Sequence, residues 1–262
     1  MMTSDRENAA RIRAVENSFG ALGRSLSIAG RVLVGQGRLM KQGRQGDQPK
    51  TFFLFNDVLV YGSIILAGCW HKKQKIIPLE DIQLEDMEDS WGMRNQWLIR
   101  TPRKSFFVSA PSVYEKHAWI KHIEECRTNL LQGASRQPGS TFAVTWIPDQ
   151  SAFKCMRCFK KFTVTNRRHH CRKCGFLVCE PCSKKRVRIE NINRHKKVRV
   201  CRTCYPQCRD DEISWSRGDS PGGNCSEEKD VAASIDEQGG NGIHKKYYFT
   251  SSDLPEHVVG VP

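Results

Sequence analysis

The stretch Asn166–Cys174, NRRHHCRKC, sets arginines, histidines and a lysine directly against two cysteines that have the spacing of metal ligands. Three interpretations fit such a stretch. It could be a metal cluster with solvated basic residues around it, a nucleic-acid contact, or a pocket for a compact and highly charged anion. The other cysteines and the distribution of charge along the chain bear on this choice.

Eight of the twelve cysteines form four CxxC pairs. A CxxC turn directs two thiolates to one tetrahedral Zn²⁺, and eight thiolates complete two closed sites of the structural kind. Only four residues separate the second pair from the third, which argues against their sharing one ion. We therefore expect an interleaved arrangement. Cys155, Cys158, Cys179 and Cys182 would hold one Zn²⁺, and Cys171, Cys174, Cys201 and Cys204 would hold the other.

The positive charge of the chain is concentrated around these cysteines. The formal net charge is +14, and residues 146–205 contain 17 Lys and Arg against three Asp and Glu. The remaining residues carry as many acidic as basic side chains. Because a solvated face usually mixes both signs, this concentration indicates an anionic partner.

The sequence also indicates where the protein works. It has neither an N-terminal apolar leader nor a run of eighteen apolar residues, so we expect a cytoplasmic protein without a membrane-spanning helix. Thiols stay reduced in the cytoplasm, which favours metal ligation over disulfides. No phosphate-binding loop or nucleophile motif is evident, and we expect no enzymatic activity.

The segment before the cysteines predicts a β domain. Between about residues 30 and 110, runs of aromatic and β-branched residues alternate with turn residues, as in an antiparallel sandwich or barrel of about seven strands. The run KTFFLFNDVLVYG predicts a tight hairpin at Asn56–Asp57. The run KIIPLEDIQLEDME is expected to continue the series of strands.

Two helices are predicted beside these strands. Ser4 and Glu7 form a capping-box pattern at the start of a helix over residues 4–18. Ser112 begins a second helix over residues 112–131, which carries one apolar stripe. The stripe consists of Trp119, Ile123, Cys126 and Leu130.

Strands followed by an amphipathic helix with a Trp resemble a pleckstrin homology domain, which implies that this helix packs its Trp onto the barrel. The expected fold class is α+β in several units. They are an N-terminal helical segment (1–27), the pleckstrin homology domain (28–131), a linker (132–143), a small two-zinc finger (144–206) and a tail (207–262). The tail is rich in Gly, Ser and acidic residues, a composition typical of disorder.

The finger resembles a FYVE domain in three motifs: WIPD (Trp146–Asp149), RRHHCR (Arg167–Arg172) and RVC (Arg199–Cys201). The resemblance implies that the finger binds phosphatidylinositol 3-phosphate on endosomal membranes. The matching headgroup-binding residues are Asp149, Arg167, Arg168, His169, His170, Arg172 and Arg199. Trp146 is expected to pack beside this pocket. Val164 and Thr165 match the tip of the loop that enters the bilayer.

A pleckstrin homology domain followed by a FYVE finger, with motifs such as FFLFND and HHCRKCGF, is similar to the Phafin family of endosomal adaptors. The resemblance implies peripheral binding to early endosomes, lysosomes or autophagosomes. It also implies a role in endosomal trafficking or fusion, in autophagy or in lysosomal function, with protein partners not identified by the sequence.

The chain departs from this pattern in two places. A lipid-binding signature in the pleckstrin homology domain would continue after Lys41 with Lys/Arg-x-Arg, whereas this chain has Gln48 and Lys50. Lipid binding, protein binding and a structural role therefore all stay open for that domain. The tail lacks the aspartate run associated with the family.

Two alternatives remain at this stage. A RING-like finger in ubiquitin transfer shares the interleaved arrangement of two zinc sites, but RING ligands usually include a His and the basic run has no use there. A nucleic-acid-binding zinc module would interleave its basic residues with exposed aromatic rings. The segment 146–205 is poor in such rings, and we expect no nucleic acid partner.

Overall fold

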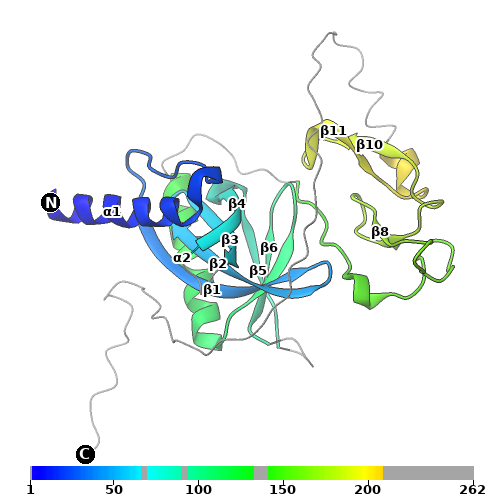
Figure 1. Ribbon diagram of the computed structural model, residues 1–262, viewed down its shortest axis with the longest axis horizontal. Coiled ribbons are helices and arrows are strands. Elements are labelled where there is room, and N and C mark those ends of the chain that lie inside the picture. The colour runs from blue at the N-terminus through cyan, green and yellow to red at the C-terminus, as the bar shows by residue number, and fades with distance from the viewer. Residues whose placement is uncertain (1, 66–69, 90–93, 133–140, 209–262) are drawn as a thin grey trace, which may run out of the picture.

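The computed structural model describes residues 2–65, 70–89, 94–132 and 141–208, with side chains from residue 5 onward (Figure 1). It contains a β domain with a helix at each end of its sequence, followed by a small cysteine-rich finger. This confirms the expected fold class. The predicted disordered tail, like most of the linker, lies outside the described residues.

One antiparallel seven-stranded sheet forms the β domain, in the order β4-β3-β2-β1-β7-β6-β5. Its strands are β1 (Leu33–Gly43), β2 (Gly46–Phe55), β3 (Val58–Ile65), β4 (Trp70–Pro78), β5 (Gln83–Asp86), β6 (Gln96–Arg100) and β7 (Phe106–Ser109). The predicted hairpin is present, since β2 ends at Phe55 and β3 begins at Val58. The run expected to continue the strands is instead divided at Leu79–Asp81, where a 3-10 turn follows Pro78 and separates β4 from β5. Pro78 is the last residue of β4, and it lacks the N–H that a further bond of the ladder would need.

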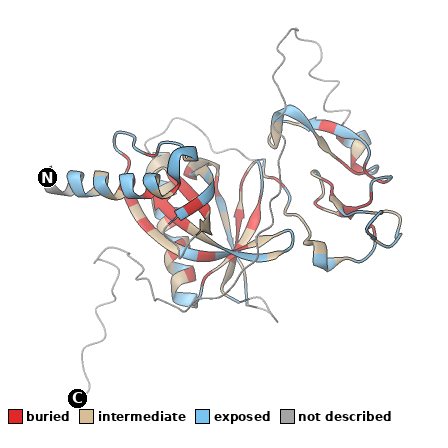
Figure 2. Ribbon diagram, viewed as in Figure 1, coloured by how far each residue is buried: buried red, intermediate tan, exposed pale blue. Residues whose placement is uncertain are grey.

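The second helix, α2 (Val113–Gln132), closes the sheet with the predicted stripe. Trp119 and Ile123 are fully buried, while Cys126 and Leu130 pack partly buried against the same core. The Oγ of Ser112 accepts a hydrogen bond from the backbone N–H of Glu115 at 3.2 Å, so Ser112 is the N-cap. Figure 2 shows the buried residues concentrated inside the curved sheet and under this helix.

The first helix, α1 (Met2–Ser18), packs on a second core at the other side of β2 and β3. Its residues Ile12 and Val15 are buried, as is Phe19 just beyond its end. A Cβ on Gly62 would lie 2.4 Å from the Phe19 ring, so only glycine lets the ring approach β3 this closely. The segment expected to be a separate N-terminal unit is therefore part of the core of the β domain.

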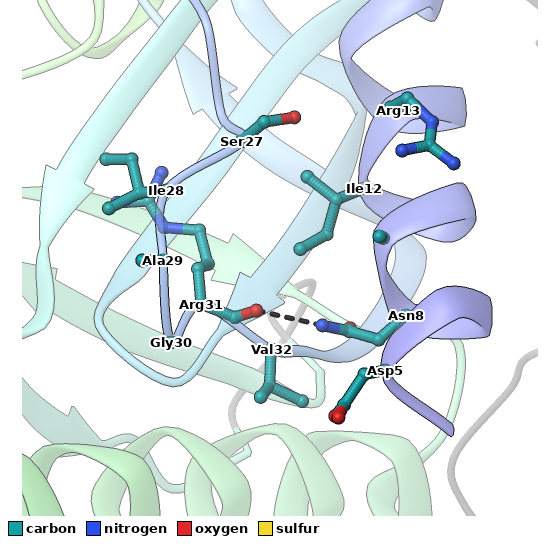
Figure 3. Close-up of a pocket in the computed structure, with 11 residues that line it drawn as sticks. Asp5, Asn8, Ile12, Arg13, Ser27, Ile28, Ala29, Gly30, Arg31 and Val32 are labelled. Carbon is teal, nitrogen blue, oxygen red and sulfur yellow. Dashed lines mark hydrogen bonds between the residues drawn. The ribbon is translucent and has the colours of Figure 1, made fainter. Parts of the chain in front are cut away.

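Asn8 fixes the helix to the chain that enters β1. Its side-chain amide donates to the carbonyl of Arg31 at 2.9 Å and accepts from the N–H of Leu33 at 3.0 Å. A recess of about 430 Å³ remains between α1 and residues 27–32 (Figure 3). In the part of the chain that the structure describes, no helix combines the length and apolarity needed to cross a bilayer.

Lys41 of β1 is a buried charged residue of the β domain. It is 7% exposed, and its Nζ lies 4.0 Å from the centroid of the Phe106 ring. Burial, together with the nearby charges of Lys104 and Lys50, lowers the pKa of Lys41 to about 7. The lysine that begins the lipid-binding signature of such domains thus lies inside the barrel.

This burial predicts a pH-dependent stability. Lys41 has a pKa near 10.5 in the unfolded chain and a pKa of about 7 in the folded protein. The unfolded state therefore binds more protons within this window, and stability rises with pH, by up to about 1.4 kcal/mol per pH unit. Urea unfolding at pH 7 and pH 9 should show this rise in the wild type and a smaller one in Lys41→Met. The exposed Lys121→Met is the control, and an equal rise in all three proteins would contradict the prediction.

Candidate metal centres and headgroup pocket

The finger contains little regular structure. Its elements are a 3-10 turn (Asp149–Ser151) and two small sheets, formed by β8 (His169–His170) with β9 (Leu177–Val178) and by β10 (Arg186–Ile189) with β11 (Asn193–Arg199). Most residues of its buried cluster are cysteines. So small a core needs metal ions to hold it together.

The eight predicted ligands meet in two groups. In each, the four sulfur atoms lie within 4.8 Å of one another, which suits a tetrahedral Zn²⁺ with four thiolates. Site 1 consists of Cys155, Cys158, Cys179 and Cys182, and site 2 of Cys171, Cys174, Cys201 and Cys204. The structure therefore brings the pairs together in the interleaved order expected from their spacing. Cys208 is buried beside these groups and belongs to neither.

Arg157, inside the first CxxC turn, connects the two sites. Its Nε lies 3.3 Å from the sulfur of Cys201, and one of its terminal nitrogens lies 3.5 Å from that of Cys174. Both sulfurs belong to site 2, whereas Arg157 lies between two ligands of site 1. These contacts raise the pKa of the guanidinium above its usual value, although burial opposes them. Arg157 can thus compensate thiolate charge at the second zinc.

His170 and Asp149 form the inner part of the predicted pocket. His170 is 4% exposed, and its Nε2 donates to the carbonyl of Ile147 at 2.7 Å. The ring stacks on Trp146 with centroids 5.0 Å apart, which places Trp146 beside the pocket as expected. The Oδ1 of Asp149 lies 3.7 Å from His170 Nε2 and, although buried, has no hydrogen-bond partner. Burial lowers the pKa of His170, so the ring is neutral near pH 7 and orients its neighbours.

His169 and Arg199 meet at one carboxylate. The Oε2 of Glu180 lies 3.2 Å from His169 Nε2 and accepts a hydrogen bond of 2.6 Å from Arg199. Arg199 also donates to Ser183, and its side chain is 15% exposed. The pKa of Glu180 is lowered mainly by the Arg199 hydrogen bond, so this carboxylate is ionised where a lipid phosphate is expected.

Of the other three arginines, only Arg172 contacts this inner group. Arg172 donates to the carbonyl of His170 at 2.8 Å and lies over the Trp146 ring. Arg167 and Arg168 are exposed and make weak contacts to backbone carbonyls at 3.4 Å, and the Arg168 guanidinium also lies 5.1 Å from the centroid of the Phe162 ring. Their guanidinium groups face solvent and can receive an anion without losing a strong bond.

The loop before these arginines is compact at its base and exposed at its tip. Backbone and side-chain bonds between Thr163 and Asn166 close a tight turn. Val164, at the tip, is 87% exposed, and Thr165 follows it with its hydroxyl 3.1 Å from that of Thr163. A rigid turn thus presents the apolar side chain.

Sequence reasoning missed Arg157 and Glu180. Each lies between the two cysteines of a CxxC turn. The spacing of the cysteines identifies the metal ligands, but it does not show where the side chains between them point. A weak signal was available for Glu180, because it is one of only three acidic residues among the 17 basic residues of this segment.

Comparison with known proteins agrees with this geometry. The family model "FYVE zinc finger" matches residues 145–210, and "PH domain" matches residues 33–128. Pleckstrin homology domain-containing family F member 2 of Homo sapiens is 48% identical over 205 residues, which cover 78% of this chain and 82% of that protein. Family F member 1 of Homo sapiens is 46% identical, covering 82% and 78%. A solution structure of a FYVE domain from Leishmania major is 36% identical, with a TM-score of 0.23, covering 29% of this chain and 83% of that one. The two metal centres of the finger are accordingly structural zinc sites.

The contacts of Arg157 predict an effect on one zinc ion only. Arg157→Ala should weaken site 2 by roughly 10- to 100-fold, as loss of outer-shell partners does, and leave site 1 unchanged. Stepwise zinc release to a chromogenic chelator measures both sites. Lys161→Ala is a charge-matched control, and Cys208→Ala should retain two ions per chain. Equal weakening of both sites would show that Arg157 acts only on folding.

Proposed function

This chain belongs to the Phafin family, the pleckstrin homology domain-containing family F, and from this membership we propose that it is a non-catalytic adaptor recruited to membranes by phosphatidylinositol 3-phosphate. The observation that supports the proposal most is the convergence of cations on the zinc-held segment. Arg172, His169 and Arg199 lie around an inner group whose buried Asp149 oxygen lacks a hydrogen-bond partner. A phosphorylated inositol ring offers both an anion for the cations and hydroxyl donors for that oxygen.

We assign each residue a role in this pocket. Arg167 and Arg168 meet the incoming phosphate first, because they are exposed and have no strong partner. Arg172, Arg199 and His169 bind it at the inner side. Asp149 accepts a hydrogen bond from a ring hydroxyl, and His170 keeps Asp149 and Trp146 in place.

The membrane supplies the remaining affinity. Insertion of Val164 and Thr165 would bury apolar surface worth about 1 to 3 kcal/mol. Each exposed lysine near an anionic leaflet, such as Lys160 or Lys161, would add roughly 1 kcal/mol without regard to the lipid isomer. Specificity therefore rests with the pocket.

The compartment follows from the lipid. A protein recruited by phosphatidylinositol 3-phosphate would bind peripherally to early endosomes and to lysosomal or autophagic membranes. There it would act in trafficking, fusion or autophagy through protein partners. The family membership leaves no support for a RING-like ligase or a nucleic-acid module.

The pocket predicts a lipid-specific defect. Arg168→Ala should weaken binding to vesicles with phosphatidylinositol 3-phosphate by about tenfold or more while two zinc ions per chain remain, because a charged hydrogen bond is worth roughly 1.5 to 3 kcal/mol. Co-sedimentation with vesicles of the 3-, 4- and 5-phosphate isomers measures this. Arg194→Ala, which removes an exposed charge from the same finger, should bind as the wild type does. Equal binding of the wild type to all three isomers would show that the basic residues bind anionic lipids without specificity.

The contacts of Glu180 with Arg199 and His169 predict a gain of affinity. Its carboxylate occupies His169 and Arg199, so a lipid phosphate must displace it. Glu180→Gln should bind the same vesicles roughly three- to tenfold more tightly, which corresponds to about 1 kcal/mol. Glu190→Gln, in an exposed pair with Arg194, is the control. A loss of affinity would mean that Glu180 positions Arg199 and His169 rather than competing with the phosphate for them.

A further inference from the structure

The β domain reaches the headgroup pocket with the turn between β1 and β2. The backbone N–H of Asp149 donates to the carbonyl of Arg44 at 3.0 Å, and the side chain of Gln150 donates to the carbonyl of Gln45 at 2.9 Å. The Nε of Arg44 lies 3.5 Å from the Oδ2 of Asp149. The side chain of Arg44 is 59% exposed, so it can also be reached from solvent. Arg44 of the β domain therefore lies beside Asp149 of the finger.

A second turn, between β6 and β7, contacts the same place. The Nζ of Lys104 lies 4.4 Å from the centroid of the Trp146 ring, and the Arg172 guanidinium lies 4.0 Å from that centroid. A hydrogen bond from Ser105 to the carbonyl of Ala143 ties the chain before Trp146 to this turn. Lys104 and Arg172, from different domains, thus share one aromatic ring.

These cations are close enough to repel one another. Burial lowers the pKa of Lys104 first, and repulsion from Arg172, Lys75 and Arg44 lowers it further. Asp149 is the carboxylate in contact with Arg44. Like charges held together in this way favour an anion among them.

We propose that Arg44 and Lys104 complete the headgroup pocket of the finger, so that residues of both domains hold a single phosphoinositide headgroup. The inference rests on the proposed function and adds two specificity-determining residues to it. Arg44 stands beside Asp149, where ring hydroxyls bind, and Lys104 stands beside Arg172, where phosphate binds. The ligand chemistry is a phosphate group on an inositol ring. Lys41 is buried, so the cations that the β domain contributes to this site are Arg44 and Lys104.

The test compares Arg44→Gln, Lys104→Gln and the double variant in the full chain. Each cation should contribute roughly fivefold to affinity, and the double variant should lose more than either single one. Two probes are used: phosphatidylcholine vesicles with phosphatidylinositol 3-phosphate, and soluble inositol 1,3-bisphosphate followed by calorimetry. Arg38→Gln removes an equal charge from the exposed face of β1 and should bind as the wild type does. Arg44→Lys should restore most of the loss, and zinc content should stay at two in every variant.

The outcomes separate the two proposals. Binding of the double variant equal to that of Arg38→Gln would overturn the shared pocket while the proposed function stands. A loss on vesicles without a loss on the soluble ligand would overturn it as well, because the cations would then contact a different lipid. A gain in Arg44→Gln would show that Arg44 blocks Asp149. Equal affinity of the wild type for the 3-, 4- and 5-phosphate isomers would instead refute the proposed function itself.

Discussion

Thiolate–zinc ligation is the constraint on which the finger depends. Its strands have two to seven residues, and its buried cluster consists mainly of the ligands themselves. Two ions are expected to supply folding free energy on the order of 10 kcal/mol each, which such a core cannot supply by apolar burial. The interleaved order links distant parts of the segment, and Arg157 joins the two sites further. The backbone of RRHHCR is held by this frame, because Cys171 is a ligand of site 2.

The frame permits an arrangement of charge that a flexible segment would avoid. Arg172 and Lys104 lie against one ring, and Arg44 stands beside Asp149. Repulsion among them makes the unliganded pocket unfavourable and an anion correspondingly favourable. Glu180 pairs with Arg199, and on the proposed function this pair would lower the affinity for a lipid phosphate.

Much of this could be predicted from the sequence, because it depends on local pattern. The four-residue gap between Cys174 and Cys179 was enough to predict the interleaved ligands, and the spacing of Trp119 and Ile123 was enough for the buried helix stripe. What could not be predicted depends on contacts between distant segments. Burial of Lys41 requires Phe106, 65 residues later, and the packing of α1 requires a glycine in β3. The contact between Arg44 and Asp149 joins residues 105 positions apart in different domains.

The central claim is that zinc ligation holds the basic residues of the finger in positions that distinguish one phosphoinositide isomer from another. It is tested most directly by measuring the ratio of vesicle affinities for the 3-phosphate and 4-phosphate isomers before and after chelation of zinc in one preparation. The lysines and arginines are the same in both states. The account predicts a large ratio with zinc and a ratio near one without it, while binding to anionic vesicles persists. A ratio that survives zinc removal would contradict the account.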